Sequence, residues 1–293
     1  KNRGLLLFAS EECEKAEEAF AEVLKINPED IDSLYNRGIS LLKLGRKETA
    51  LEYLEKVVSL RPDYPDLSYS LGVALTELGE YEKALETFEK LASENPYDLE
   101  IQCRRGKLAM EVGNYETALQ AFERILTEKP ASREAWYRKG LALLKLENFE
   151  EAVKAFDAVA TKDADYEDAG VLKGFAQMKL KECASALETF ERVLEKKPDS
   201  DTAWYYRGMI LYTLQRQEEA AKAFESASRL NPRLYTAFEY RAKCLFETGQ
   251  YEAAFEALET VLEKDPENLS ALEKRAICLF ELKKNKDAVD ALS

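Results

Sequence analysis

The chain has 293 residues, of which 46% are hydrophobic and 33% are charged, enough to bury the core of one or two globular domains. Its 56 acidic residues exceed its 42 basic ones, and the resulting net charge of −14 at pH 7 repels nucleic-acid phosphates. No apolar run approaches the roughly 18 residues that cross a membrane. We therefore expect neither nucleic acid nor a membrane as a partner.

The first stretch, KNRGLLLFAS (1–10), places basic residues before a short apolar run. Its glycine and leucines share a period with the rest of the chain, so we interpret it as part of a helix rather than as a signal peptide. The next stretch, 31–64, carries two sets of apolar residues at helical spacing. Leu34 and Leu41 belong to the first set, and Leu54 and Val57 to the second. Together they predict a pair of amphipathic helices.

This helix pair recurs every 34 residues along the chain. Proline stands at 28, 62, 96, 130, 198, 232 and 266, and alanine at 16, 50, 84, 118, 152, 186, 220, 254 and 288. Glycine at the eighth position of most repeats lets two helices approach closely, and a phenylalanine or leucine four residues after each alanine fills the adjacent space. Gly45, Gly79, Gly113 and Gly249 are predicted to end first helices in a left-handed turn.

A 34-residue unit with a bulky residue at position 4 (Trp136, Trp204, Phe238), glycine at 8, alanine at 20, phenylalanine at 24 and proline at 32 resembles the tetratricopeptide repeat. The resemblance implies an all-α, right-handed α-solenoid superhelix of stacked antiparallel helix pairs. One array would span 1–293, with a partial repeat 1–30, full repeats 31–64, 65–98, 99–132, 133–166, 167–200, 201–234 and 235–268, and a partial repeat 269–293. Because both ends interrupt a repeat, we expect an excerpt of a longer protein.

Two features depart from the family pattern. Position 7 is basic where the family is usually apolar, at Arg37, Arg105, Lys139, Lys173, Arg207, Arg241 and Arg275. Repeat 167–200 follows the irregular stretch TKDADYEDAGVLKG (161–174), which has Ala164 for proline, Gly170 for a bulky residue and, just beyond it, Gln177 for leucine. We expect a weakly packed junction there, as a hinge or as imperfect packing, with Phe175 or Tyr166 partly filling the space.

No catalytic chemistry is visible in the sequence. Histidine is absent, no nucleophile or phosphate-binding motif occurs, and the five cysteines lack the pairing of a zinc site or disulfide framework. We expect a cytoplasmic, non-enzymatic scaffold for protein binding, without cofactor or metal. The alternatives are a spacer or self-association arm of a larger protein, associating through its uncapped ends, and a regulatory array attached to an enzyme domain outside this segment.

The resemblance also implies a concave groove lined by first helices, mainly at repeat positions 2, 5, 6, 9, 12 and 13. Residues that differ between repeats at these positions are candidates for partner recognition: Tyr35, Asn36, Tyr69, Arg104, Lys107, Tyr137, Arg138, Phe175, Tyr205, Tyr206, Met209, Tyr212 and Tyr240. Their apolar and aromatic character favours an apolar peptide or helix. The alternative at positions 9 and 12 is packing between adjacent first helices, whereas the position-5 tyrosines are expected to be exposed.

Arg104, Lys107 and Arg138, which we call the mid-groove basic spot, could bind acidic residues of the partner. The alternative is that Glu100 and Glu134, four residues before the two arginines, pair with them on the helix surface. Chaperone-binding members of the family hold a C-terminal carboxylate with lysine, asparagine and arginine at set positions. Lys1 and Asn36 match that pattern, but Leu5, Asp66 and Ser70 do not, so we do not expect this ligand.

Overall fold

The computed structural model describes residues 1–160 and 168–282, which form α-helices joined by short turns without a β-strand among them. The helices are α1 (Asn2–Ala9), α2 (Cys13–Ile26), α3 (Ile31–Lys43), α4 (Lys47–Leu60), α5 (Leu67–Leu78), α6 (Tyr81–Glu94), α7 (Leu99–Glu111), α8 (Tyr115–Glu128), α9 (Arg133–Lys145), α10 (Phe149–Ala160), α11 (Ala169–Lys179), α12 (Cys183–Lys196), α13 (Asp201–Thr213), α14 (Gln217–Leu230), α15 (Tyr235–Glu247), α16 (Tyr251–Leu262) and α17 (Leu269–Glu281).

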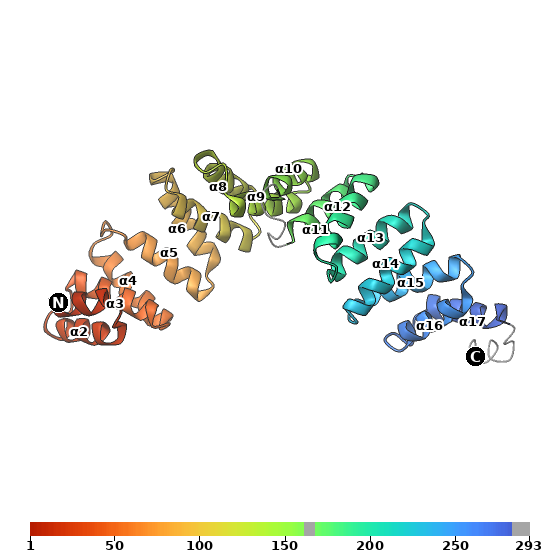
Figure 1. Cartoon of the computed structure of the whole chain (residues 1–293). Helices are drawn as coiled ribbons and strands as arrows, with labels where there is room; N and C mark the ends of the chain where they lie inside the picture. The colour runs from red at the N-terminus through yellow and green to blue at the C-terminus, as the bar shows by residue number, and fades with distance from the viewer. Residues whose placement is uncertain (161–167, 283–293) are drawn as a thin grey trace. The chain divides into compact units, whose positions relative to one another are not determined.

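The chain divides into two compact units, unit 1 (Lys1–Leu146) with α1 to α9 and unit 2 (Glu147–Ser293) with α10 to α17. Within each unit, every helix packs chiefly against the helices before and after it in sequence (Figure 1). Because two helices cannot bury both of their apolar faces alone, stacking of successive pairs supplies the core. The predicted all-α solenoid class is confirmed.

A glycine and a phenylalanine from the two helices of one repeat form the core of most repeats. A Cβ added to Gly174 would lie 2.6 Å from the Phe190 ring, and one added to Gly208 would lie 2.8 Å from the Phe224 ring. Both rings are fully buried. The predicted close approach of the two backbones, with the large residue filling the space beside the glycine, is therefore confirmed.

The turn between the two helices of a repeat uses a left-handed residue at position 15. The predicted glycines adopt it, with φ of 74° at Gly45 and 73° at Gly249. The same conformation occurs at residues other than glycine, namely Glu11, Glu147, Lys181 and Gln215. A side chain in this region costs about 1–2 kcal/mol, so the packed helix pair, rather than the turn residue, determines the turn geometry in these repeats.

The basic residues at position 7 connect successive repeats. Five of the seven pair with a carboxylate sixteen residues earlier, on the second helix of the preceding repeat: Lys139 with Glu123, Lys173 with Asp157, Arg207 with Glu191, Arg241 with Glu225, and Arg275 with Glu259. Arg37 pairs instead with Glu17, and Arg105 donates to Gln102 and Gln120. The Lys173 Nζ to Asp157 Oδ1 distance is 2.6 Å, and this lysine side chain is only 14% exposed. A polar residue replaces the apolar family residue because it links two helices at the edge of the core.

In the irregular repeat 167–200, the second helix α12 packs against the first helix α11 where other repeats have a bulky residue at position 4. A Cβ added to Gly170 would lie 2.6 Å from Cγ2 of Val193, so the backbone has moved into the place of the bulky residue. Contrary to our expectation, Phe175 is not the residue that fills this space, because only Val193 of the described residues lies within 4 Å of the added Cβ, and the Phe175 ring lies 5.5 Å from that of Tyr206. Ala164 and Tyr166 lie outside the described residues, and the proposed weakness of the junction stays a prediction.

Candidate functional site

The thirteen predicted groove residues all lie on first helices and are all half-buried. Seven belong to unit 1 on α3, α5, α7 and α9, and six belong to unit 2 on α11, α13 and α15. The position-5 tyrosines are thus less exposed than expected. At positions 9 and 12 the candidate side chains are half-buried, whereas Ile277 and Phe280 at the same positions are exposed, so packing between first helices accounts for only part of this surface.

In unit 1 the tyrosine hydroxyls are used to connect repeats. Tyr35 Oη lies 2.9 Å from Ser70 Oγ, and Tyr69 Oη accepts a hydrogen bond of 2.7 Å from Arg104 Nε. Asn36 donates to its own helix, at the Asp32 carbonyl. Burial raises the pKa of Tyr35, so its hydroxyl stays protonated at neutral pH. These polar groups are already partnered within the chain, which leaves mainly ring faces and edges for a ligand.

The mid-groove basic spot is largely neutralised by internal carboxylates. Arg104 Nε lies 2.9 Å from Glu100 Oε1, and Arg138 Nε lies 3.0 Å from Glu134 Oε1, so the predicted helix-surface pairs are confirmed. Lys107 Nζ from α7 lies 3.0 Å from the same Glu134 oxygen. One carboxylate therefore bridges two cations that belong to successive repeats, an arrangement we call the Glu134 bridge.

The Glu134 bridge gives a pH-dependent contribution to stability. Hydrogen bonds from Lys107 and Arg138 lower the pKa of Glu134 below its ordinary value of 4.5. A carboxylate whose pKa is lowered in the folded state stabilises the fold at pH values above its unfolded pKa. This stabilisation is lost as the pH falls through the folded pKa. Glu134→Gln should therefore cost up to about 1 kcal/mol at pH 7, since exposed pairs are screened, and the difference from wild type should shrink as the pH falls below 4.5 and vanish below the folded pKa of Glu134.

Urea unfolding of wild type and Glu134→Gln across this pH range measures the effect. Glu94→Gln is the matched control, because Glu94 is exposed and makes no ion pair among the residues that the structure describes. An equal response of the two variants to pH would contradict a stabilising role for the bridge.

In unit 2 the candidate residues form a series of aromatic contacts on α11, α13 and α15. The Tyr206 ring lies 5.5 Å from the rings of Phe175 and Tyr205, and the Tyr212 ring lies 5.8 Å from that of Tyr240. Met209 packs against the buried core residues of unit 2. Offset and edge-on contacts of this kind fix the rings while leaving their outer surfaces accessible.

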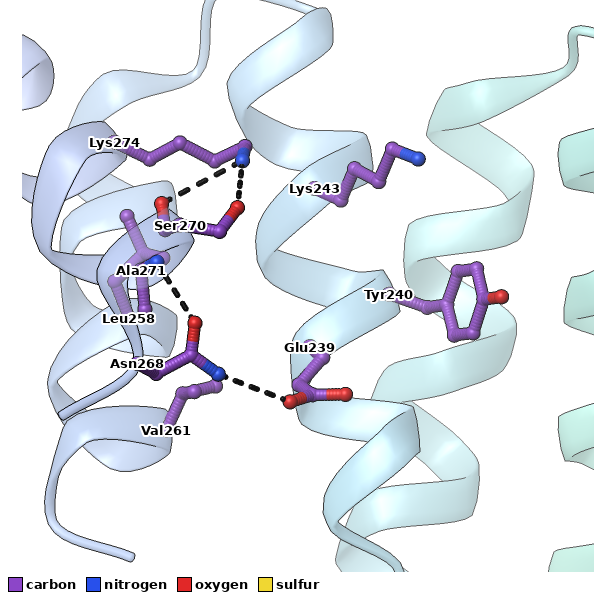
Figure 2. Close-up of a pocket in the computed structure, with 9 residues that line it drawn as sticks. All are labelled: Glu239, Tyr240, Lys243, Leu258, Val261, Asn268, Ser270, Ala271 and Lys274. Atoms are coloured by element: carbon purple, nitrogen blue, oxygen red, sulfur yellow. Dashed lines mark hydrogen bonds between the residues drawn. The ribbon is translucent and has the colours of Figure 1, made fainter. Parts of the chain in front are cut away.

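A pocket of about 320 Å³ opens at the end of this aromatic series, between α15, α16 and α17 (Figure 2). Its lining comprises Glu239, Tyr240 and Lys243 of α15, Leu258 and Val261 of α16, Asn268 at the N-cap of α17, and Ser270, Ala271 and Lys274 of α17. Asn268 donates to Glu239 across the pocket at 3.3 Å. We call this the α15–α17 pocket.

Of the residues lining the pocket, only Tyr240 was among the sequence candidates. The sequence signal that could have revealed the pocket is the pair of residues at repeat positions 2 and 6. Glu100 and Glu134 precede Arg104 and Arg138 by four residues, whereas Ser270 precedes Lys274. Lys274 accordingly donates to the Ser270 hydroxyl and carbonyl, and no carboxylate among the described residues lies within ion-pair distance of its ammonium.

The described residues contain no metal site, and neither of their two buried cysteines is a reactive thiol. No group of three or more histidine, cysteine, aspartate or glutamate side chains there could hold a metal ion. Burial raises the pKa of the Cys244 thiol to about 12 and of the Cys278 thiol to about 11, so both stay protonated and unreactive. Nor does the described part contain a helix of the length and apolar character that crosses a membrane.

Solved structures with the same fold include a TPR repeat-containing protein of Cytophaga hutchinsonii, whose C-terminal part is 19% identical at a TM-score of 0.69, covering 82% of this chain and 98% of that chain. YrrB, described as a TPR protein with an unusual peptide-binding site, is 23% identical at a TM-score of 0.54, and the match covers 64% of this chain and 97% of YrrB. MamA of Desulfovibrio magneticus RS-1 is 28% identical at a TM-score of 0.51, and the match covers 59% of this chain and 98% of the MamA chain. No curated protein matches the sequence.

Family models agree with these structures. The model described as anaphase-promoting complex, cyclosome, subunit 3 matches residues 227–293. The tetratricopeptide repeat model matches residues 1–65, 35–98, 103–167 and 172–234, which is most of the chain. The sequence period, the stacked helix pairs and this match lead to one conclusion: the chain belongs to the tetratricopeptide repeat family.

Proposed function

We propose that this chain is a non-catalytic protein-interaction scaffold that binds a peptide or partner helix on the face formed by its first helices. The observation that carries the proposal is the aromatic series of unit 2, in which Phe175, Tyr205, Tyr206, Tyr212 and Tyr240 are packed on one side and accessible on the other. Fixed aromatic rings supply contact area at a low cost in conformational entropy.

Two further observations support a protein ligand. The chain is strongly acidic, which disfavours nucleic acid, and the polar groups of unit 1 are engaged by internal partners. YrrB, which shares the fold, is described by its peptide-binding site. The expected ligand is therefore an apolar or amphipathic segment, read by helix-in-groove or extended-peptide contacts.

The test uses peptides selected on the wild-type chain from a displayed random library. Tyr205→Ala and Tyr212→Ala should each weaken binding of the selected peptides by about tenfold or more, as expected for aromatic anchors. Tyr81→Ala is the matched control, because Tyr81 lies on the second helix α6 and is 37% exposed. Fluorescence polarisation gives the affinities, and circular dichroism verifies the fold.

Equal affinity of the Tyr205→Ala, Tyr212→Ala and Tyr81→Ala variants would contradict the proposed binding face. Selection of no peptide at all by the wild-type chain would contradict peptide binding itself.

A further inference from the structure

The chain contains two versions of one arrangement of charges. In unit 1, Lys107 at position 9 and Arg138 at position 6 of the next repeat are joined by the Glu134 carboxylate at position 2, with both distances 3.0 Å. Lys243, Ser270 and Lys274 occupy the same three positions in the α15–α17 pocket. The pocket thus has both cations of the Glu134 bridge and a serine in place of its carboxylate.

No carboxylate among the described residues makes an ion pair with either lysine of the pocket, although Glu247, one turn along α15, attracts Lys243 electrostatically. Lys274 is held by Ser270, and Lys243 lies over the Tyr212 ring, 5.0 Å from its centre. In Figure 2, Lys274 and Ser270 extend from α17 into the gap that faces α15. The hydrogen bond of Lys243 with the Tyr212 hydroxyl raises the pKa of this lysine, so it stays charged at neutral pH.

From this comparison we infer that the α15–α17 pocket binds the carboxylate of an aspartate or glutamate side chain of the partner, in the place that Glu134 takes in unit 1. The inference rests on the proposed function, because the carboxylate would belong to the same peptide that binds the aromatic series of unit 2. Tyr240 belongs to both the aromatic series and the α15–α17 pocket, since it contacts Tyr212 and also lines the pocket.

The charge of the pocket favours a carboxylate over a phosphoryl group. Lys243 and Lys274 contribute two positive charges, and Glu239, held by the Asn268 amide, contributes one negative charge. The lining residues thus carry a net charge of +1, and Glu247 beside Lys243 lowers the positive potential further, so the pocket suits a carboxylate monoanion. A phosphoryl group carries about −1.5 to −2 at neutral pH and would face both the excess charge and repulsion from Glu239.

Ser270→Glu provides the sharpest test, because it restores the internal carboxylate of unit 1 and should close the pocket to an acidic ligand. Peptides selected on wild type should carry aspartate or glutamate at one fixed position. Exchange of that residue for glutamine or asparagine should weaken wild-type binding by about tenfold or more, the effect of one charge-assisted hydrogen bond. On Ser270→Glu and Lys274→Gln the same exchange should change affinity by less than about twofold.

Ser185→Glu is the matched control, since it makes the same change at an exposed residue of the second helix α12 and should behave as wild type. Peptides that depend on Tyr205 but show no acidic preference, or bind Lys274→Gln unchanged, would overturn the pocket and leave the binding face intact. Tighter binding of a phosphoserine peptide than of its glutamate counterpart would overturn the assignment to a carboxylate. Failure to select any peptide would overturn both proposals.

Discussion

Phe224→Ala is expected to lower the free energy of unfolding of unit 2 by about 3–5 kcal/mol, the range for removal of a fully buried aromatic ring. The Phe224 ring is 0% exposed and lies against the Gly208 backbone. It also lies 5.3 Å from the Tyr240 ring and 5.9 Å from the Tyr205 ring. The surrounding helices already touch at Gly208, so they have little room to collapse into the cavity.

The same substitution should also impair ligand binding, because Phe224 supports two residues of the proposed binding face from below. Phe280→Ala is the control, since it removes the same ring from a position that is 62% exposed and should cost within about 0.5 kcal/mol. Repeat arrays can unfold in parts, so urea denaturation should be combined with hydrogen exchange over α13 to α16. Equal costs for the two variants would refute the packing account.

The periodic features of the fold could be predicted from the sequence because each depends on residues close together in the chain. The contact between Gly174 and Phe190, for example, follows from a fixed spacing within one helix pair. The ion pairs of position 7 were missed, although the spacing of sixteen between Lys173 and Asp157 recurs in the sequence. Helical spacing rules consider three or four residues along one helix and do not extend to the helix of the preceding repeat.

The candidate site was less predictable, because it depends on which charges find an internal partner. Arg138 and Lys274 occupy the same repeat position and have the same formal charge. Only the residue four positions earlier, Glu134 or Ser270, decides whether the cation is neutralised. The sequence therefore predicted the mid-groove basic spot, whose charges are neutralised by carboxylates of the chain itself. The pocket also requires the directions of side chains from three helices, which repeat positions alone do not give.

The irregular repeat contains a buried polar pair that single and double substitutions can distinguish from a packing defect. Thr189 Oγ1 donates a hydrogen bond of 2.8 Å to Gln177 Oε1, and both residues are almost fully buried. Thr189→Val should cost about 1–3 kcal/mol, because it leaves the Gln177 amide buried without its donor. Thr87→Val is the control at the same repeat position, where the hydroxyl bonds only to its own helix at the Lys83 carbonyl.

The double variant Gln177→Leu with Thr189→Val should recover most of that loss and have a stability within about 1 kcal/mol of wild type, because both partners become apolar with little change of shape. Leucine is also the residue of other repeats at this position, as at Leu143 and Leu211. Urea denaturation of Thr189→Val, Gln177→Leu and the double variant measures the coupling between the two sites. If the double variant were as unstable as Thr189→Val alone, the polar pair would not account for Gln177, and the tight approach of Gly170 to Val193 would remain as the reason why this repeat departs from the pattern.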